Sequence, residues 1–186
     1  MPVINAIKGI HDRVFAMLET LAGNWLLGLA ARLVFSSVLL VFFVNSAMTK
    51  VGSGFPDMFV PGIGAYAQIL PLIAEAAGYD PGKIALFPWK LIVLAGTYAE
   101  FLLPIMLLVG LFTRFTALAL IGFIVVMSFV DIQFHGLDAE SIGMVFDRVQ
   151  NAIIADQRLL WIFPLVYLVL KGGGPVSVDG VISRAR

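Results

Sequence analysis

The chain has 186 residues, of which 60% are hydrophobic, and its mean hydropathy is +0.99. Soluble domains are only about 45–50% apolar even when glycine is counted, so this composition favours an integral membrane protein. The formal net charge of zero gives no support for nucleic acid as a partner, and the lack of cysteine excludes a disulfide framework, a CxxC redox pair and thiolate metal ligands.

The N-terminal segment, residues 4–21, predicts an amphipathic helix that lies on the membrane surface before the first span. Its apolar residues recur at helical spacing, with polar residues between them. The apolar positions are Ile7, Ile10, Val14, Met17, Leu18 and Leu21. The first 25 residues lack the apolar core and the small-residue cleavage site of a signal peptide, so we expect the first span to be the targeting element.

Four segments are long and apolar enough to cross the membrane as helices. The clearest runs from Leu91 to Thr113, 23 positions with a single charge, and about 20 apolar residues cross ~30 Å of hydrocarbon. The predicted spans are residues 26–47, 89–111, 115–133 and 151–170. The second and third spans are so close in sequence that they predict a tight helical hairpin. We therefore predict an all-α fold, a polytopic membrane four-helix bundle that forms one domain over residues 1–186.

Two connections between the spans carry predicted short helices. Residues 66–77 are apolar but contain Pro71 and are too short to span, so we predict an interfacial or re-entrant helix between the first and second spans, packed on the bundle. Residues 131–150 form a polar, acidic loop, in which we predict a short helix from Ala139 to Arg148.

Four spans place both termini on the same side of the membrane. Six Lys and Arg residues fall on that side and five on the other, so the excess of positive charge is small. The long acidic connections lie opposite the termini. Positive charge marks the cytoplasmic side of a membrane protein, and we therefore expect both termini in the cytoplasm and the protein in a bacterial inner membrane.

Two charges lie inside predicted spans: Arg32 in the first and Glu100 near the middle of the second. An acidic or basic residue at mid-span costs about 2.5–3.5 kcal/mol on insertion scales. Because the charges are opposite, we predict an intramembrane ion pair between Arg32 and Glu100. Three interpretations stay open: a structural pair that fixes helix register, a ligand or proton site, and snorkelling of Arg32 to the interface.

Glu100 also belongs to a predicted polar pocket within the second span. Pro104 lies four residues later and cannot donate to the carbonyl of Glu100, which leaves that oxygen free. Thr97 lies one turn earlier on the same helix face. The alternative is a proline kink whose free carbonyl is satisfied by a neighbouring helix.

Polar residues at the outer ends of the spans are further candidates. Asn45 and Lys50 close the first span and Asp156 lies in the first turns of the fourth, so these three are predicted to line the mouth of an outward-facing cavity. Further polar residues of the same face are predicted to form its floor: Thr49, Asp131, His135, Asn151, Gln157 and Arg158. The alternative is that they are ordinary polar groups at helix ends. His135 has no second histidine or cysteine spaced to help it, so we expect no metal site.

Several of these features, taken in order from about Gly28 to Asp179, resemble the DoxX family of small four-helix membrane proteins. The first span carries Arg32 early and ends near Lys50, and the second carries Glu100. The family's hairpin motif is matched by Gly110, Leu111, Phe112, Thr113 and Arg114, and its C-terminal motif by Gly174, Pro175, Val176, Ser177, Val178 and Asp179. The chain departs from the family at Asn45 and Ser46, where relatives often carry glycine.

The resemblance implies an accessory subunit of a membrane redox system rather than an enzyme in its own right. Such a subunit would bind a protein partner and, in a core lined by Arg32 and Glu100, a quinone or a lipid. Because the chain has no cysteine, any thiol chemistry would belong to the partner or to a bound cofactor. The alternatives are a quinone-reducing oxidoreductase subunit with Glu100 as proton relay, and a small proton-coupled transporter. A homo-oligomer also stays open.

Overall fold

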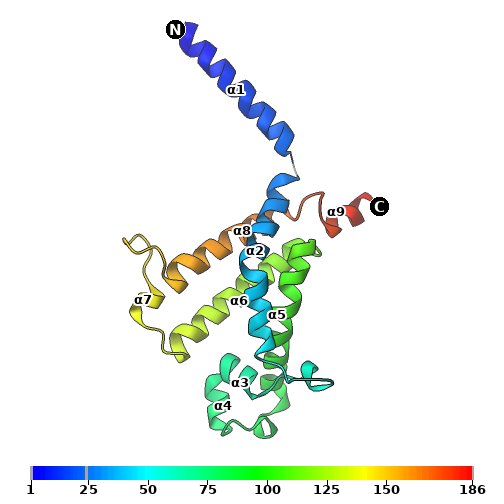
Figure 1. The fold of residues 1–186 in the computed structure, drawn as a ribbon, viewed down its shortest axis with the longest axis vertical. Helices are drawn as coiled ribbons and strands as arrows, with labels where there is room; N and C mark the ends of the chain where they lie inside the picture. Colours follow the sequence, from blue (N-terminus) through cyan, green and yellow to red (C-terminus); the bar gives the residue numbers. More distant parts are fainter. Residues whose placement is uncertain (1, 24, 186) are drawn as a thin grey trace.

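A computed structural model describes residues 2–23 and 25–185 of the chain. Four long helices form its body: α2 (Leu26–Met48), α5 (Leu91–Val109), α6 (Thr113–Phe134) and α8 (Leu159–Lys171) (Figure 1). One irregular turn precedes α5, η3 (Leu86–Lys90), and another precedes α8, η4 (Ile153–Arg158). The described residues contain no β-strand, which confirms the predicted all-α fold.

The four long helices are long and apolar enough to cross a bilayer. With their preceding turns they cover Leu26–Met48, Leu86–Val109, Thr113–Phe134 and Ile153–Lys171. Each end lies within three residues of the predicted span. The chain is therefore an integral membrane protein with four candidate spans.

The interior of the bundle is built from apolar side chains of all four long helices. Helix α2 contacts both α5 and α8, and α6 packs against α8 and α5. The buried cluster consists of Phe35, Leu39, Phe43, Leu107, Ala117, Leu120, Ile124, Leu165 and Leu168. The outward faces are also apolar, as Val34, Val38 and Val41 of α2 show by their exposure. Helices that are apolar both toward the bundle interior and toward the outside are typical of helices surrounded by lipid.

A sharp turn joins α5 to α6. Helix α5 ends at Val109, and the following Gly110 has a φ of +73°, a left-handed conformation that glycine adopts without strain. Helix α6 begins at Thr113, so the predicted tight hairpin is confirmed. Below this turn the two helices diverge in the view of Figure 1.

Short helices cover the end of the bundle opposite the hairpin. Helices α3 (Ile63–Ile69) and α4 (Pro71–Ala76) correspond to the predicted short helix between the first two spans, which is broken at Leu70, and α3 packs on α5. The remaining short turns there are η1 (Asp57–Phe59) and η2 (Pro81–Lys83).

The acidic connection after α6 forms less helix than predicted. Helix α7 spans only Ala139–Ile142, because Gly143, with a φ of +68°, ends it. The predicted extension to Arg148 is therefore wrong.

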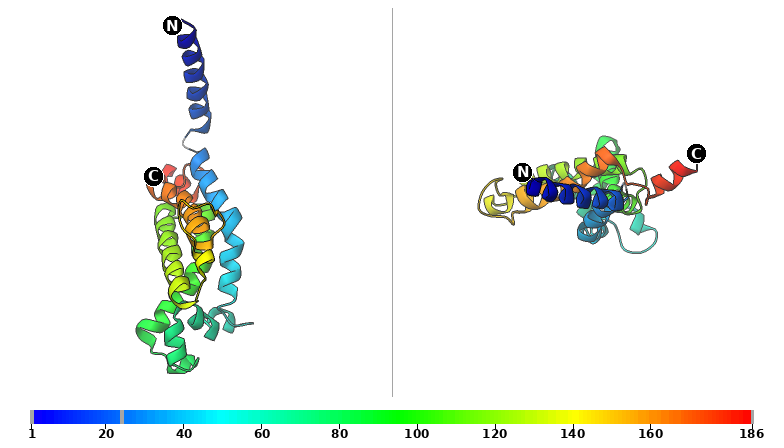
Figure 2. Two further views of the ribbon diagram at one scale, coloured as in Figure 1. Left: turned by 90° about the vertical axis from the view of Figure 1, so that its left-hand side faces the viewer. Right: turned by 90° about the horizontal axis from the view of Figure 1, so that it is seen from above.

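The two ends of the chain lie at the hairpin end of the bundle (Figure 1). Helix α1 (Pro2–Ala22) confirms the predicted N-terminal helix, but it projects away from the bundle and residues 4–21 are all exposed (Figure 2). Its placement on the membrane surface stays a prediction. Helix α9 (Val178–Arg184) closes the described chain and packs beside the α5–α6 turn through its first residues.

Candidate functional site

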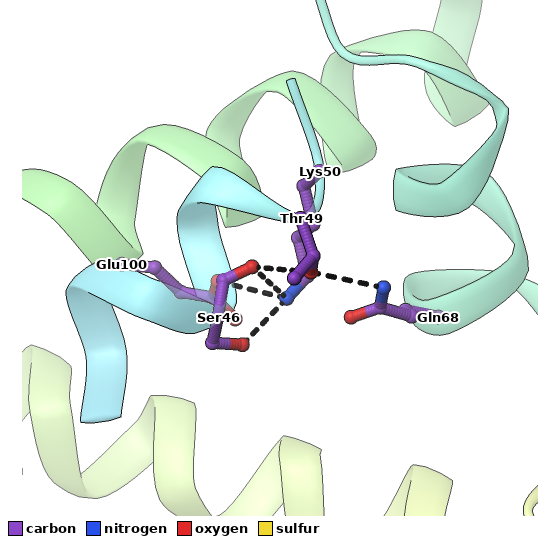
Figure 3. Close-up of polar contacts among 5 residues, drawn as sticks. All are labelled: Ser46, Thr49, Lys50, Gln68 and Glu100. Carbon is purple, nitrogen blue, oxygen red and sulfur yellow. Dashed lines mark hydrogen bonds and ion pairs between the residues drawn. The ribbon is translucent and has the colours of Figure 1, made fainter. Parts of the chain in front are cut away.

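Glu100 pairs with Lys50 inside the bundle. The Nζ atom of Lys50 lies 2.8 Å from Oε2 of Glu100, and the two side chains are 4% and 5% exposed. Lys50 follows the end of α2 and reaches back one turn, where its Nζ also donates to the carbonyl and the hydroxyl of Ser46 (Figure 3). The three donors of the ammonium group are thereby used within the protein.

The predicted pair between Arg32 and Glu100 is wrong. Arg32 donates through Nη1 to the carbonyl of Leu108 at 2.8 Å and through Nη2 to the carbonyl of Val176. Helices α2 and α5 run antiparallel, so Arg32, early in α2, lies beside the last turn of α5, whereas Glu100 lies beside the end of α2. The last carbonyls of a helix lack partners within it, and Arg32 satisfies one of them.

A second charged cluster lies at the ends of α6 and η4. Arg158 donates through Nη1 to the hydroxyl of Ser128 at 2.9 Å and through Nη2 to the carboxylate of Asp131. The other oxygen of that carboxylate lies 2.8 Å from Nδ1 of His135. Arg158 is 6% exposed, and within residues 2–23 and 25–185 its buried Nε has no hydrogen-bond partner.

A cavity of about 600 Å³ lies between these two clusters. Lys50 and Glu100 line one part of its wall, and Asp131, His135 and Arg158 line another. The rest of the wall is mainly apolar and comes from α2, α3, α5 and α6. It is formed by Phe42, Ser46, Gln68, Ile69, Ile92, Gly96, Ala99, Leu103, Ala119, Gly122, Phe123, Val126, Met127 and Val130.

Small residues of α5 and α6 keep the cavity open. At Gly122 a Cβ atom would meet no neighbouring atom within 4 Å, so this glycine borders empty space. At Gly96 the same atom would lie 3.1 Å from the side chain of Ile69, because α3 covers α5 there. The cavity also reaches the outer surface of the bundle, since the lining residues Ile92 and Val126 are 42% and 61% exposed.

The charges around the cavity balance. Lys50 neutralises Glu100 and Arg158 neutralises Asp131, while His135 adds a charge only when it is protonated. A cavity with mainly apolar walls, balanced charges and a few polar side chains suits a neutral amphiphile.

The other predicted site residues lie outside the cavity wall. Thr97 is fully buried one turn before Glu100, and its hydroxyl finds no partner among the described residues. Asn45 is exposed. The carboxylate of Asp156 accepts from the backbone N–H of Ala152 at 2.9 Å and so stabilises the start of its own helical turn. Neither Asn45 nor Asp156 lines the mouth as predicted.

The sequence predictions missed several residues of the site. Ser46 and Gln68 were not candidates, although Ser46 lies one turn before Lys50, the spacing at which a lysine reaches back along a helix. By contrast, Asp131, His135 and Arg158 were predicted at the same face as Lys50, and they do line the cavity with it. Asp131 and His135 are one turn apart at the end of α6, and the packing of α6 against α8 brings Arg158 to them.

The hairpin segment 110–114 and the C-terminal segment 174–179 lie in contact at the hairpin end. The carboxylate of Asp179 accepts from the backbone N–H groups of Phe112 and Thr113 at 2.8 and 2.7 Å, and from the hydroxyl of Thr113 at 2.7 Å. Its own N–H donates to the carbonyl of Gly110. Ser177 accepts from the N–H of Gly180 and begins α9. Asp179 thus caps the start of α6, where a negative charge is favoured.

The described residues contain no group of three or more His, Cys, Asp or Glu side chains arranged to hold a metal ion. Comparisons with protein-family models, with curated proteins and with solved structures found no match.

Proposed function

We propose that this protein is a DoxX-like, non-catalytic subunit of a membrane redox system and that its cavity binds a quinone. The observation that carries the proposal is the cavity of about 600 Å³ whose mainly apolar wall holds two neutralised ion pairs. Residence in a bacterial inner membrane, cytoplasmic termini and a protein partner with its own redox centre belong to the same proposal.

The chemistry of the cavity supports a quinone over a charged ligand. A quinone is neutral, its ring and tail are apolar, and its carbonyl oxygens accept hydrogen bonds. The polar side chains of Ser46 and Gln68 also line the wall, and their hydroxyl and amide groups can donate to such an oxygen. An anion would upset the balance of charge in a region of low dielectric constant, which costs free energy.

The position of the cavity supports delivery of the ligand from the bilayer. Ile92 of α5 and Val126 of α6 lie at both the cavity wall and the exposed surface of two candidate spans. A ligand dissolved in lipid therefore has a route between α5 and α6, and its apolar tail can remain in the hydrocarbon.

The alternative is a quinone-reducing subunit in which Glu100 relays protons. Titratable groups at two parts of the wall, Glu100 and the pair of His135 with Asp131, favour it. Reduction of a quinone to a quinol takes up electrons and protons, so the electrons would have to come from the partner. This alternative would be supported if the Glu100→Gln variant still bound quinone but the complex formed quinol more slowly.

A substitution that fills the cavity tests the proposal. We expect Gly122→Leu to weaken binding of decylubiquinone at least about tenfold, or ~1.4 kcal/mol, because its side chain enters the open space beside Gly122. Binding is followed in detergent by quenching of tryptophan fluorescence, since Trp161 packs against the lining residue Phe42 at a ring-centroid distance of 5.7 Å.

The matched control is Gly9→Leu, which changes a glycine of α1 that also borders open space. It is expected to leave quinone binding unchanged. Equal binding by the Gly122 variant and the unmodified protein, with both folded, would contradict a quinone site in this cavity.

A further inference from the structure

A second hollow lies at the opposite end of the bundle from the quinone cavity. Its volume is about 710 Å³, and it is bordered by the start of α6, the turn after α8 and helix α9. Two arginines line it, Arg114 from α6 and Arg184 from α9. None of its residues lines the first cavity, so the two sites are independent.

The arginine side chains at this hollow are available to a ligand. Both are exposed, and in the part of the chain that the structure describes neither takes part in a salt bridge. A Cβ atom at Gly172 would lie 3.4 Å from Nε of Arg114, so the arginine lies against the glycine turn that ends α8. The turn therefore holds Arg114 at the wall of the hollow.

Among the described residues that line the hollow, the one carboxylate, that of Asp179, does not neutralise these arginines. Asp179 is engaged by two backbone N–H groups and the hydroxyl of Thr113 at the start of α6. Two cations against one internally satisfied anion leave the hollow positively charged. A positive hollow favours an anionic ligand.

The surroundings of the hollow identify the source of that anion as lipid. The hollow lies where the candidate span of α6 begins and that of α8 ends, at Thr113 and Lys171. Phe112 and Phe115 line it and are 65% and 68% exposed. Aromatic residues beside basic ones at a span end are typical of the headgroup region, where phosphate and acyl chain meet.

We propose that Arg114 and Arg184 bind the phosphate of an anionic phospholipid at the hairpin end of the bundle, with Phe112 and Phe115 against its acyl chains. The arginines supply charge-assisted hydrogen bonds to the phosphate oxygens. The site holds a structural lipid at the edge of the bundle, whatever ligand occupies the quinone cavity.

Native mass spectrometry of the full chain in detergent tests this site. The probes are phosphatidylglycerol and phosphatidylcholine with identical acyl chains. We expect selective retention of phosphatidylglycerol, and for the double variant Arg114→Gln/Arg184→Gln at least about tenfold weaker retention, since each basic residue near the membrane surface contributes to anionic-lipid binding.

The control is the double variant Lys8→Gln/Arg13→Gln, which removes the same charge from α1 and is expected to keep phosphatidylglycerol bound. Equal loss in this control would overturn the site, because it would show a general effect of charge. Equal retention of both lipids, or release of the lipid by millimolar inorganic phosphate alone, would likewise overturn a lipid headgroup site.

Discussion

The carboxylate of Glu100 and the ammonium of Lys50 depend on each other, because neither has access to bulk water. Both side chains are at most 5% exposed. Removing one partner of a buried pair leaves the other charge uncompensated and costs about 3–5 kcal/mol, whereas replacing both is often neutral. Single and double substitutions of the pair should therefore differ clearly in their effect on the free energy of unfolding.

We predict that Lys50→Met and Glu100→Gln each lower the free energy of unfolding by about 3–5 kcal/mol, and that the double variant recovers most of this loss. Unfolding is followed in detergent by circular dichroism. Lys83→Met, at an exposed lysine, is the control and should change stability by less than about 0.5 kcal/mol. Additive effects of the two single substitutions would show that the pair contributes no coupling.

The sequence identifies Glu100 as a site residue more readily than it identifies the side chain that pairs with it. An acidic residue in an apolar run is visible in the sequence, and Glu100 is indeed buried in an ion pair. Its partner depends on how far α2 is shifted along α5, which no local pattern encodes. Lys50 lies beyond the apolar run of the first span and was assigned to the mouth, although its long side chain reaches back to Glu100.

At the scale of elements, one carboxylate attaches the C-terminal segment to the α5–α6 turn. Asp179 accepts from Phe112 and Thr113, and its N–H donates to Gly110. A Cβ atom at Gly110 would lie 2.5 Å from that of Ser177, so the two segments approach more closely than any other residue at 110 allows. The position of α9 is therefore fixed by its contacts with the α5–α6 turn.

We predict that Asp179→Ala detaches α9, because it removes the cap of α6 and the link to α9 together. The expected loss of stability is about 1–2 kcal/mol, and hydrogen exchange at residues 178–184 should speed up while exchange within α8 stays unchanged. Ser183→Ala, which removes a hydroxyl contact inside α9, is the control. Unchanged exchange in the Asp179 variant would mean that the tail is held by other contacts.

Span positions were predictable because hydropathy is a local property of the sequence. The start of α6 and the end of α8 follow from the loss of apolar residues and from the glycines at 172–174. The end of α7 was not predictable in this way, because the residues after Gly143 remain compatible with helix and only the left-handed conformation of this glycine ends it.

At the scale of the whole molecule, the four candidate spans return the C-terminus to the side of the N-terminus (Figure 1). Residues near both ends should therefore react from one side of the membrane, and the loops around α3 and α7 from the other. The absence of cysteine from the chain makes single-cysteine labelling a clean test.

We predict that Gly9→Cys and Ser183→Cys are protected from a membrane-impermeant maleimide in intact cells, whereas Asp57→Cys and Glu140→Cys are labelled. All four positions are exposed. Permeabilised cells provide the control, because all four should then react. Labelling of Gly9→Cys or Ser183→Cys in intact cells would place the termini outside and reverse the proposed orientation.

The contacts of Arg32 have a consequence for biogenesis. Arg32 lies in the first of the four candidate spans, whereas Val176, one of its two acceptors, follows the last of them and is synthesised later. During synthesis α2 therefore carries a guanidinium into the bilayer before its full set of acceptors exists, at a depth where an unsatisfied charge is costly. Chains that stop before residue 176 lack this acceptor, and we therefore expect them to be less stable in the membrane than the full chain.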